Sequence, residues 1–230
     1  MSRVGTARVY GLRAYDWTRS KLGNCRVGPL VTVPDLWDPF ASSLDQTRVF
    51  RRAWDCDPSV LLLYATRNPQ GMLDWWRGVI QTHGQMDWFL KVRAKGPRAG
   101  VLLVIGKQVE VSAAVELKKI FPALCWVLML NPREPLDFRA LDPDFVILGI
   151  DATVHARALP LPLEWARSIR DQSRLFWFKS WGGWIPKDQG PASGFYKTEK
   201  DGYVRSTVAH VPLLDGRAHK DLPEWFTLPC

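Results

Sequence analysis

The sequence predicts an α/β fold: a partial β/α barrel of the TIM type, with about six parallel strands and a loop-rich C-terminal extension. Short apolar runs alternate with longer amphipathic stretches about six times along the 230 residues. With 47% hydrophobic and 23% charged residues, the composition is that of a globular chain long enough to bury a stable core. An open doubly wound sheet is the alternative arrangement for such right-handed crossovers.

The apolar runs are expected to form buried parallel strands, because strands covered on both faces have few polar positions. These runs are residues 30–33, 60–65, 101–105, 125–130, 145–150 and 175–178.

Four amphipathic stretches between the strands predict helices, since their apolar residues recur on one helical side. They cover residues 44–54, 72–80, 113–121 and 163–170. The second is expected to start at Asn68-Pro69, and the fourth follows Pro160 and Pro162.

The remaining segments are less regular. Residues 130–145 contain three prolines and leave room for about one turn of helix, and residues 88–92 suggest an irregular strand. We therefore expect a basic N-terminal arm over residues 1–29, the barrel over 30–185, and a loop-rich extension over 186–230 that packs on the barrel.

Charge points to a polyanionic partner. The chain carries a formal net charge of +8, and residues 1–30 contribute +5 of it through six basic residues and one acidic residue. Such an arm can follow a phosphate backbone, although a solvated tail is the alternative interpretation.

The N-terminus and the cysteines indicate a cytoplasmic protein. No apolar signal segment follows Met1, and no apolar run approaches the roughly 20 residues that span a bilayer, so no membrane association is expected. The four cysteines, Cys25, Cys56, Cys125 and Cys230, are 31, 69 and 105 residues apart, which matches no local metal or redox motif.

Candidate site residues follow from the strand ends, because both folds place their sites at the carboxyl ends of parallel strands. Three carboxylates fall there, Glu110, Glu134 and Asp151, and each is either an acid–base candidate or a structural residue in a turn or salt bridge. The cationic candidates for ligand or partner binding are Arg67, Lys107, Arg133, Arg157 and Lys179.

Two tryptophans flank a Gly-Gly turn near the last strand end. Trp181 and Trp184 are either stacking platforms for bases or part of the core. No Gly-rich phosphate loop and no Gly-x-Ser-x-Gly elbow is present.

A metal site is not expected. His210, Asp215 and His219 lie within ten residues, but their spacing does not match a zinc helix, and Asp215-Gly216 more simply makes a turn.

The strand-end segments also resemble a known family. Residues 165–172, Trp-Ala-Arg-Ser-Ile-Arg-Asp-Gln, carry the most specific match. They resemble Trp-Val-Arg-Ser-Leu-Arg-Asp-Gln in uncharacterised bacteriophage and bacterial proteins related to the radical S-adenosylmethionine enzymes. The other matching segments are 34–37, 63–69, 106–110, 134–136, 149–157, 178–182 and 214–217.

The resemblance implies a partial barrel, but the chain departs from the family at the cofactor positions. Relatives carry a Cys-x3-Cys-x2-Cys loop for an iron–sulfur cluster, whereas this chain has only Cys25 in that region. Ile150 and Asp151 replace a Gly and a Glu expected near S-adenosylmethionine. The cluster and S-adenosylmethionine are therefore expected to be lost, and no other cofactor is expected.

The sequence thus predicts a phage-encoded cytoplasmic accessory protein, a catalytically degenerate relative that binds a host protein or nucleic acid. The alternative is an enzyme that modifies a nucleotide or nucleic acid by non-radical chemistry with Glu110, Glu134 or Asp151.

Overall fold

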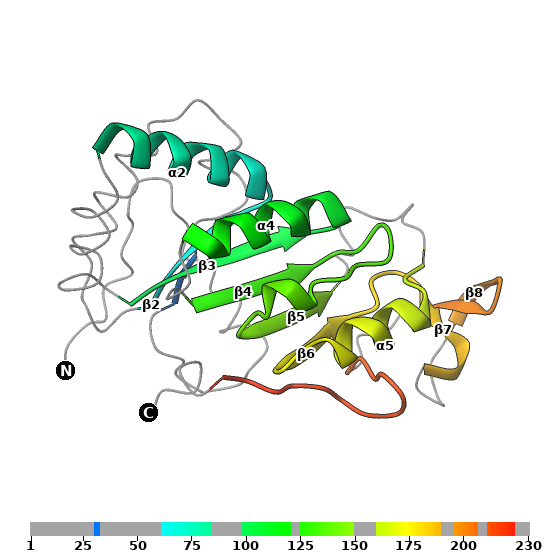
Figure 1. Cartoon of the computed structure of the whole chain (residues 1–230). Helices are drawn as coiled ribbons and strands as arrows, with labels where there is room; N and C mark the ends of the chain where they lie inside the picture. Colours follow the sequence, from blue (N-terminus) through cyan, green and yellow to red (C-terminus); the bar gives the residue numbers. More distant parts are fainter. Residues whose placement is uncertain are drawn as a thin grey trace, which may run out of the picture. The chain divides into compact units, whose positions relative to one another are not determined.

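The computed structural model describes residues 30–32, 61–83, 98–120, 125–149, 160–189, 196–206 and 211–223 (Figure 1). The chain divides into two compact units. Unit 1 consists of Met1–Val104, Ser112–Trp126 and Glu224–Cys230, and unit 2 of Ile105–Val111 and Val127–Pro223.

Unit 1 contains a run of parallel strands. β1 (Leu30–Thr32) pairs with β2 (Leu61–Thr66), and β2 pairs with β3 (Arg98–Ile105). Val101 to Leu103 are buried, as expected for a strand covered on both faces.

Helix α2 (Pro69–His83) follows β2 and begins where the sequence predicts. The Asn68 side chain caps it, since the Gly71 N–H donates to Asn68 Oδ1 over 2.9 Å. Pro69 occupies the first helical position, where its missing N–H costs nothing. The helix buries Met72, Leu73 and Trp76.

Unit 2 holds three further parallel strands. β4 (Cys125–Leu130) pairs with β5 (Phe145–Gly149), which pairs with β6 (Phe176–Ser180) (Figure 1). All side chains from Phe145 to Leu148 are buried, so both faces of the central strand are covered.

The connections in unit 2 agree with the sequence pattern. One 3-10 turn, η2 (Arg139–Leu141), interrupts the Pro-rich stretch between β4 and β5. Helix α5 (Leu163–Asp171) begins after Pro162 and buries Ala166 and Ile169. Helix α4 (Gln108–Ile120), which begins in unit 2 and ends in unit 1, starts five residues before the predicted range.

The C-terminal extension is more regular than predicted. It contains β7 (Ile185–Pro186), the 3-10 turn η3 (Lys187–Gln189), β8 (Tyr196–Lys200) and β9 (Tyr203–Ser206). These strands form an antiparallel sheet in the order β7-β9-β8. The two-residue turn between β8 and β9 is Asp201-Gly202, with φ of 50° and 80°, which fits a type I′ hairpin.

Residues 211–223 run along β6 and extend its hydrogen bonding. Trp177 and Lys220 form an antiparallel bridge. The Phe178 N–H donates to the His219 carbonyl, and the Asp221 N–H donates to the Phe176 carbonyl, each over 3.0 Å. This segment therefore satisfies backbone groups on one side of β6 that would otherwise be open to pairing.

These elements confirm a mixed α/β fold with parallel strands. Barrel closure is not seen among the described strands, and the partial barrel stays a prediction. The predicted helix over 44–54, the strand over 88–92 and the arm over 1–29 lie outside the described residues. No helix in the described ranges is long and apolar enough to cross a membrane.

Candidate functional site

The candidate site of unit 2 lies where β3, β4, β5 and β6 end. We call residues 106–110, 131–134, 149 and 179–184 the strand-end edge. Ligands of parallel α/β sheets bind outside the carboxyl ends of the strands, so the side chains of these loops are the first to consider. Backbone bonds join two of the loops, since the Asn131 N–H donates to the Ile105 carbonyl over 2.9 Å.

Glu110 stabilises the start of its own helix. Its Oε2 atom accepts hydrogen bonds from the N–H groups of Gly106, over 2.6 Å, and Lys107, over 3.0 Å. These N–H groups precede or begin α4 and have no intrahelical acceptor. The negative charge also faces the positive end of the helix dipole. Glu110 therefore acts as a helix cap.

Glu134 fixes the neighbouring loop to the same helix start. Its Oε1 atom accepts from the Gln108 N–H over 2.6 Å. The Gln108 side chain forms two hydrogen bonds with the Asp137 backbone, donating over 2.9 Å and accepting over 2.8 Å. Residues 131–137 are thus held against the first turn of α4, and these contacts favour the structural interpretation of both glutamates.

Lys107 and Arg133 are exposed beside these capped amides. The Arg133 N–H donates to the Gly106 carbonyl over 2.8 Å, which places its Cα next to the end of β3. Among the described residues, neither cation forms an ion pair with a carboxylate. The structure therefore brings two of the predicted cations together on adjoining loops.

The other predicted cations are distributed differently. Lys179 is half-buried on β6, beside Gly149. Arg67 is exposed in unit 1, directly after β2. Arg157 and the carboxylate candidate Asp151 lie outside the described residues.

Trp181 belongs to the core, which corrects its proposed role as a stacking platform. Its side chain is 2% exposed, and its ring packs edge-to-face on Phe178 with centroids 4.7 Å apart. Its Nε1 donates to the Leu213 carbonyl over 2.9 Å, so both the ring and its polar atom are already engaged. Trp184 is partly exposed and keeps the stacking role as a prediction.

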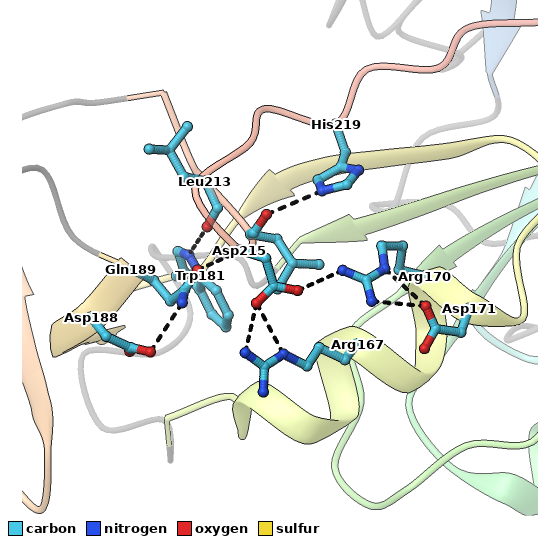
Figure 2. A network of polar contacts seen from close by, with 10 residues as sticks. Arg167, Arg170, Asp171, Trp181, Asp188, Gln189, Leu213, Asp215 and His219 are labelled. Atoms are coloured by element: carbon cyan, nitrogen blue, oxygen red, sulfur yellow. Dashed lines mark hydrogen bonds and ion pairs between the residues drawn. The ribbon is translucent and has the colours of Figure 1, made fainter.

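A second charged cluster ties residues 211–223 to α5, and we call Arg167, Arg170, Gln189 and Asp215 the C-terminal clamp (Figure 2). Asp215 Oδ1 accepts from Arg167 Nε over 3.0 Å and from Nη2 over 2.7 Å. Its Oδ2 accepts from Arg170 Nη1 over 2.6 Å, and its backbone N–H donates to Gln189 Oε1 over 2.6 Å.

The charges of the clamp stabilise one another. The hydrogen bonds from Arg167 and then Arg170 hold the pKa of Asp215 below its ordinary value of 3.8. The hydrogen bond to Asp215 raises the pKa of each arginine. Asp215 and Gly216 have φ of 54° and 74°, which confirms the predicted Asp-Gly turn.

The described side chains around this turn have other contacts. His219 Nε2 lies 3.2 Å from the Leu214 carbonyl, and its ring packs edge-to-face on Phe176. His210 lies outside the described residues. Within those residues, no three His, Cys, Asp or Glu side chains are grouped so as to hold a metal ion. The described cysteine, Cys125, is the first residue of β4.

No family model, curated protein or solved structure matches this chain. The resemblance to relatives of the radical S-adenosylmethionine enzymes, and the loss of their cofactors, therefore stay predictions.

The contacts nevertheless show what the matching segments do here. Arg167 and Arg170, from residues 165–172, bind Asp215 of residues 214–217. Gln172 of the same segment donates to the Leu136 carbonyl over 2.9 Å and accepts from the Phe138 N–H over 2.9 Å. These motif residues therefore hold parts of unit 2 together.

Proposed function

We propose that this chain is a binding protein that holds the phosphate backbone of a nucleic acid at the strand-end edge, with Lys107 and Arg133 as contacts. The observation that carries the proposal is the exposure of these two cations on adjoining loops whose carboxylates face backbone amides. Exposed lysine and arginine side chains supply the sequence-independent part of nucleic-acid affinity by neutralising phosphates.

The charge balance supports the same partner. The chain as a whole carries +8, so long-range attraction favours polyanions. Glu110 and Glu134 lie near the cations, but the positive end of the α4 dipole offsets part of their charge. Trp184, partly exposed beyond β6, adds an aromatic surface on which a base can stack.

The acid–base alternative has less support. General acid–base catalysis needs a carboxylate within reach of a substrate proton, whereas Glu110 and Glu134 direct oxygens at backbone N–H groups of α4 and its preceding loop. The proposal therefore treats the chain as a binder, in keeping with the predicted degenerate, phage-encoded and cytoplasmic character. A partial barrel would add further strand ends to the same face.

Binding of labelled single-stranded DNA, duplex DNA and RNA to the full chain, measured by fluorescence anisotropy at several salt concentrations, tests the proposal. Lys107→Gln combined with Arg133→Gln is expected to weaken binding of every probe that the wild type holds. The slope of log affinity against log salt should fall by about 2, since two phosphate contacts are lost.

The matched control removes the same charge elsewhere in unit 2. Arg174 precedes β6 at its amino end, and Arg217 lies in the Asp-Gly turn; both side chains are exposed. Arg174→Gln combined with Arg217→Gln should leave the slope nearly unchanged. A wild type that binds none of the three probes, or a control that loses as much affinity as the edge variant, overturns the proposal. The first of these results would favour a protein partner.

The loss of radical chemistry is tested separately. Three thiolates at one loop are needed for the cluster, and residues 1–30 contain a single cysteine, Cys25. Protein reconstituted anaerobically with iron and sulfide is expected to hold no stoichiometric cluster. Stoichiometric iron and sulfide together with cleavage of S-adenosylmethionine would show that the chain is an active enzyme.

A further inference from the structure

β5 and β6 pair irregularly at their carboxyl ends. Leu148 is opposite Phe178, but Gly149 is opposite Ser180, so Lys179 is an additional residue of β6 at this point of the register. Such a bulge inserts one residue into a strand and redirects its side chain, and bulges are common beside functional sites.

Gly149 provides the space that the redirected side chain occupies. A Cβ atom at position 149 would lie 3.0 Å from Lys179 Cβ, 3.3 Å from Cδ and 3.5 Å from Cγ. The aliphatic stem of Lys179 therefore lies across the α-carbon of Gly149. The φ angle of Gly149 is not in the positive range, so the glycine is needed for space and not for backbone conformation.

At Gly106, at the end of β3, the glycine is needed beside the Asn131 carbonyl and not beneath a basic side chain. A Cβ atom there would lie 3.6 Å from Arg133 Cγ and 3.8 Å from Arg133 Cδ, and 2.9 Å from the Asn131 carbonyl oxygen. Arg133 would be in ordinary van der Waals contact with such a Cβ, so of these two cations Lys179 alone depends on a glycine for the path of its stem. Long basic side chains commonly place their stems on such surfaces while the charged group reaches solvent.

We propose that Gly149 is a positioning residue, which lays Lys179 along the strand-end edge so that Lys179 and Arg133 meet different phosphates of one nucleic-acid strand. The inference rests on the proposed function and adds Lys179 to its contacts. Arg133 follows β4 and lies next to the end of β3, whereas Lys179 lies on β6, so at least two strand spacings, roughly 10 Å, separate their backbones. That separation exceeds what one phosphate bridges, which is why two phosphates are expected.

Gly149→Ala in the full chain tests the inference, because it displaces the Lys179 stem without changing net charge. The Gly149→Ala variant is expected to bind the DNA or RNA probe as weakly as Lys179→Gln does. In Lys179→Gln, the slope of log affinity against log salt should be lower than in the wild type by about 1, because one phosphate contact is lost. Gly78→Ala is the control: it lies in α2, outside the strand-end edge, a Cβ there meets nothing within 4 Å, and the variant is expected to bind like the wild type.

A double-mutant cycle separates positioning from a general loss of structure. In the Lys179→Gln background, Gly149→Ala should have no further effect on affinity, because the cation it positions is gone. Additive losses would mean that Gly149 acts otherwise, and an unchanged salt slope in Lys179→Gln would remove Lys179 from the site; either result overturns the inference. Neither result would change whether wild-type binding depends on Lys107 and Arg133. The proposed function is therefore tested separately, by the variants of those two residues.

Discussion

In the C-terminal clamp, the Asp215 carboxylate accepts hydrogen bonds from Arg167 and Arg170, whereas at the strand-end edge Glu110 and Glu134 accept from backbone N–H groups. Both regions combine carboxylates with basic residues inside unit 2. In the clamp, positive and negative charges are paired with each other. At the edge the carboxylates are engaged by the helix start, and Lys107 and Arg133 remain exposed.

The difference shows that basic residues are paired or left exposed according to which donors the nearby carboxylates bind. The clamp arginines are part of the most distinctive sequence segment, yet their contacts are internal. Lys107 and Arg133 have less distinctive surroundings in the sequence, and we propose that they contact a partner. Disrupting the clamp should therefore change stability, and disrupting the edge cations should change binding.

Removing Trp181 should have the largest effect on stability. Its buried ring packs on Phe178, and its Nε1 holds the Leu213 carbonyl next to the clamp. Trp181→Ala is expected to lower the free energy of unfolding by about 3 to 5 kcal/mol, as for other large core truncations. Urea denaturation measures it. Trp184→Ala, at a partly exposed position, should cost clearly less, and equal losses would contradict the assignment of Trp181 to the core.

Asp215→Asn should have the next largest effect. The amide keeps the shape of the carboxylate and tolerates the positive φ of 54°, but it cannot neutralise two guanidinium groups. We expect a loss of about 1 to 2 kcal/mol in urea denaturation, because the lost bonds are charge-assisted but partly solvated. Asp171→Asn is the control, because Asp171 pairs only with Arg170 in this cluster and is more exposed than Asp215. If Asp171→Asn lowered the free energy of unfolding as much as Asp215→Asn, the stabilising role of the C-terminal clamp would be contradicted.

The stabilisation by Asp215 should depend on pH in a defined direction. Its pKa is lowered in the folded protein by the hydrogen bonds from Arg167 and Arg170. A carboxylate whose pKa is lower in the folded than in the unfolded protein stabilises the fold. This stabilisation is complete at pH values above the pKa of the unfolded state, and it is lost as the pH falls through the pKa of the folded state. The difference in unfolding free energy between wild type and Asp215→Asn should therefore be constant near neutral pH and shrink below 3.8. A difference that grows on acidification would contradict this origin.

The parallel-strand elements of the fold were predictable because buried strands leave a strong signal. The apolar run over 125–130 coincides with β4, and the Asn-Pro signal marks the start of α2. β6 extends two residues past its predicted end, since Lys179 and Ser180 interrupt the apolar pattern. β8 and β9 were missed because their residues are largely polar, although Asp201-Gly202 between β-forming residues is a hairpin signal.

The site was predictable only in part. The strand-end rule selects Lys107, Arg133 and both glutamates, but it does not say which groups the glutamates bind. The arginine partners of Asp215 lie 48 and 45 residues away, and local patterns do not reveal such distant pairing. The burial of Trp181 likewise depends on Leu213, 32 residues away.

Glu134→Gln gives the smallest change, and it distinguishes a loop-fixing glutamate from a catalytic one. The variant keeps an oxygen acceptor for the Gln108 N–H but loses the charge that faces the start of α4, so we expect a loss of about 1 kcal/mol in urea denaturation. Nucleic-acid affinity should stay equal or rise, because a negative charge beside Lys107 and Arg133 is removed. Glu164→Gln, in the exposed first turn of α5, makes the same chemical change away from the edge and should alter neither quantity by as much. Reduced affinity in Glu134→Gln at unchanged stability would mean that this carboxylate contacts the ligand directly. The proposal that the glutamates of the strand-end edge are structural, and that only its exposed cations bind the nucleic acid, would then be wrong.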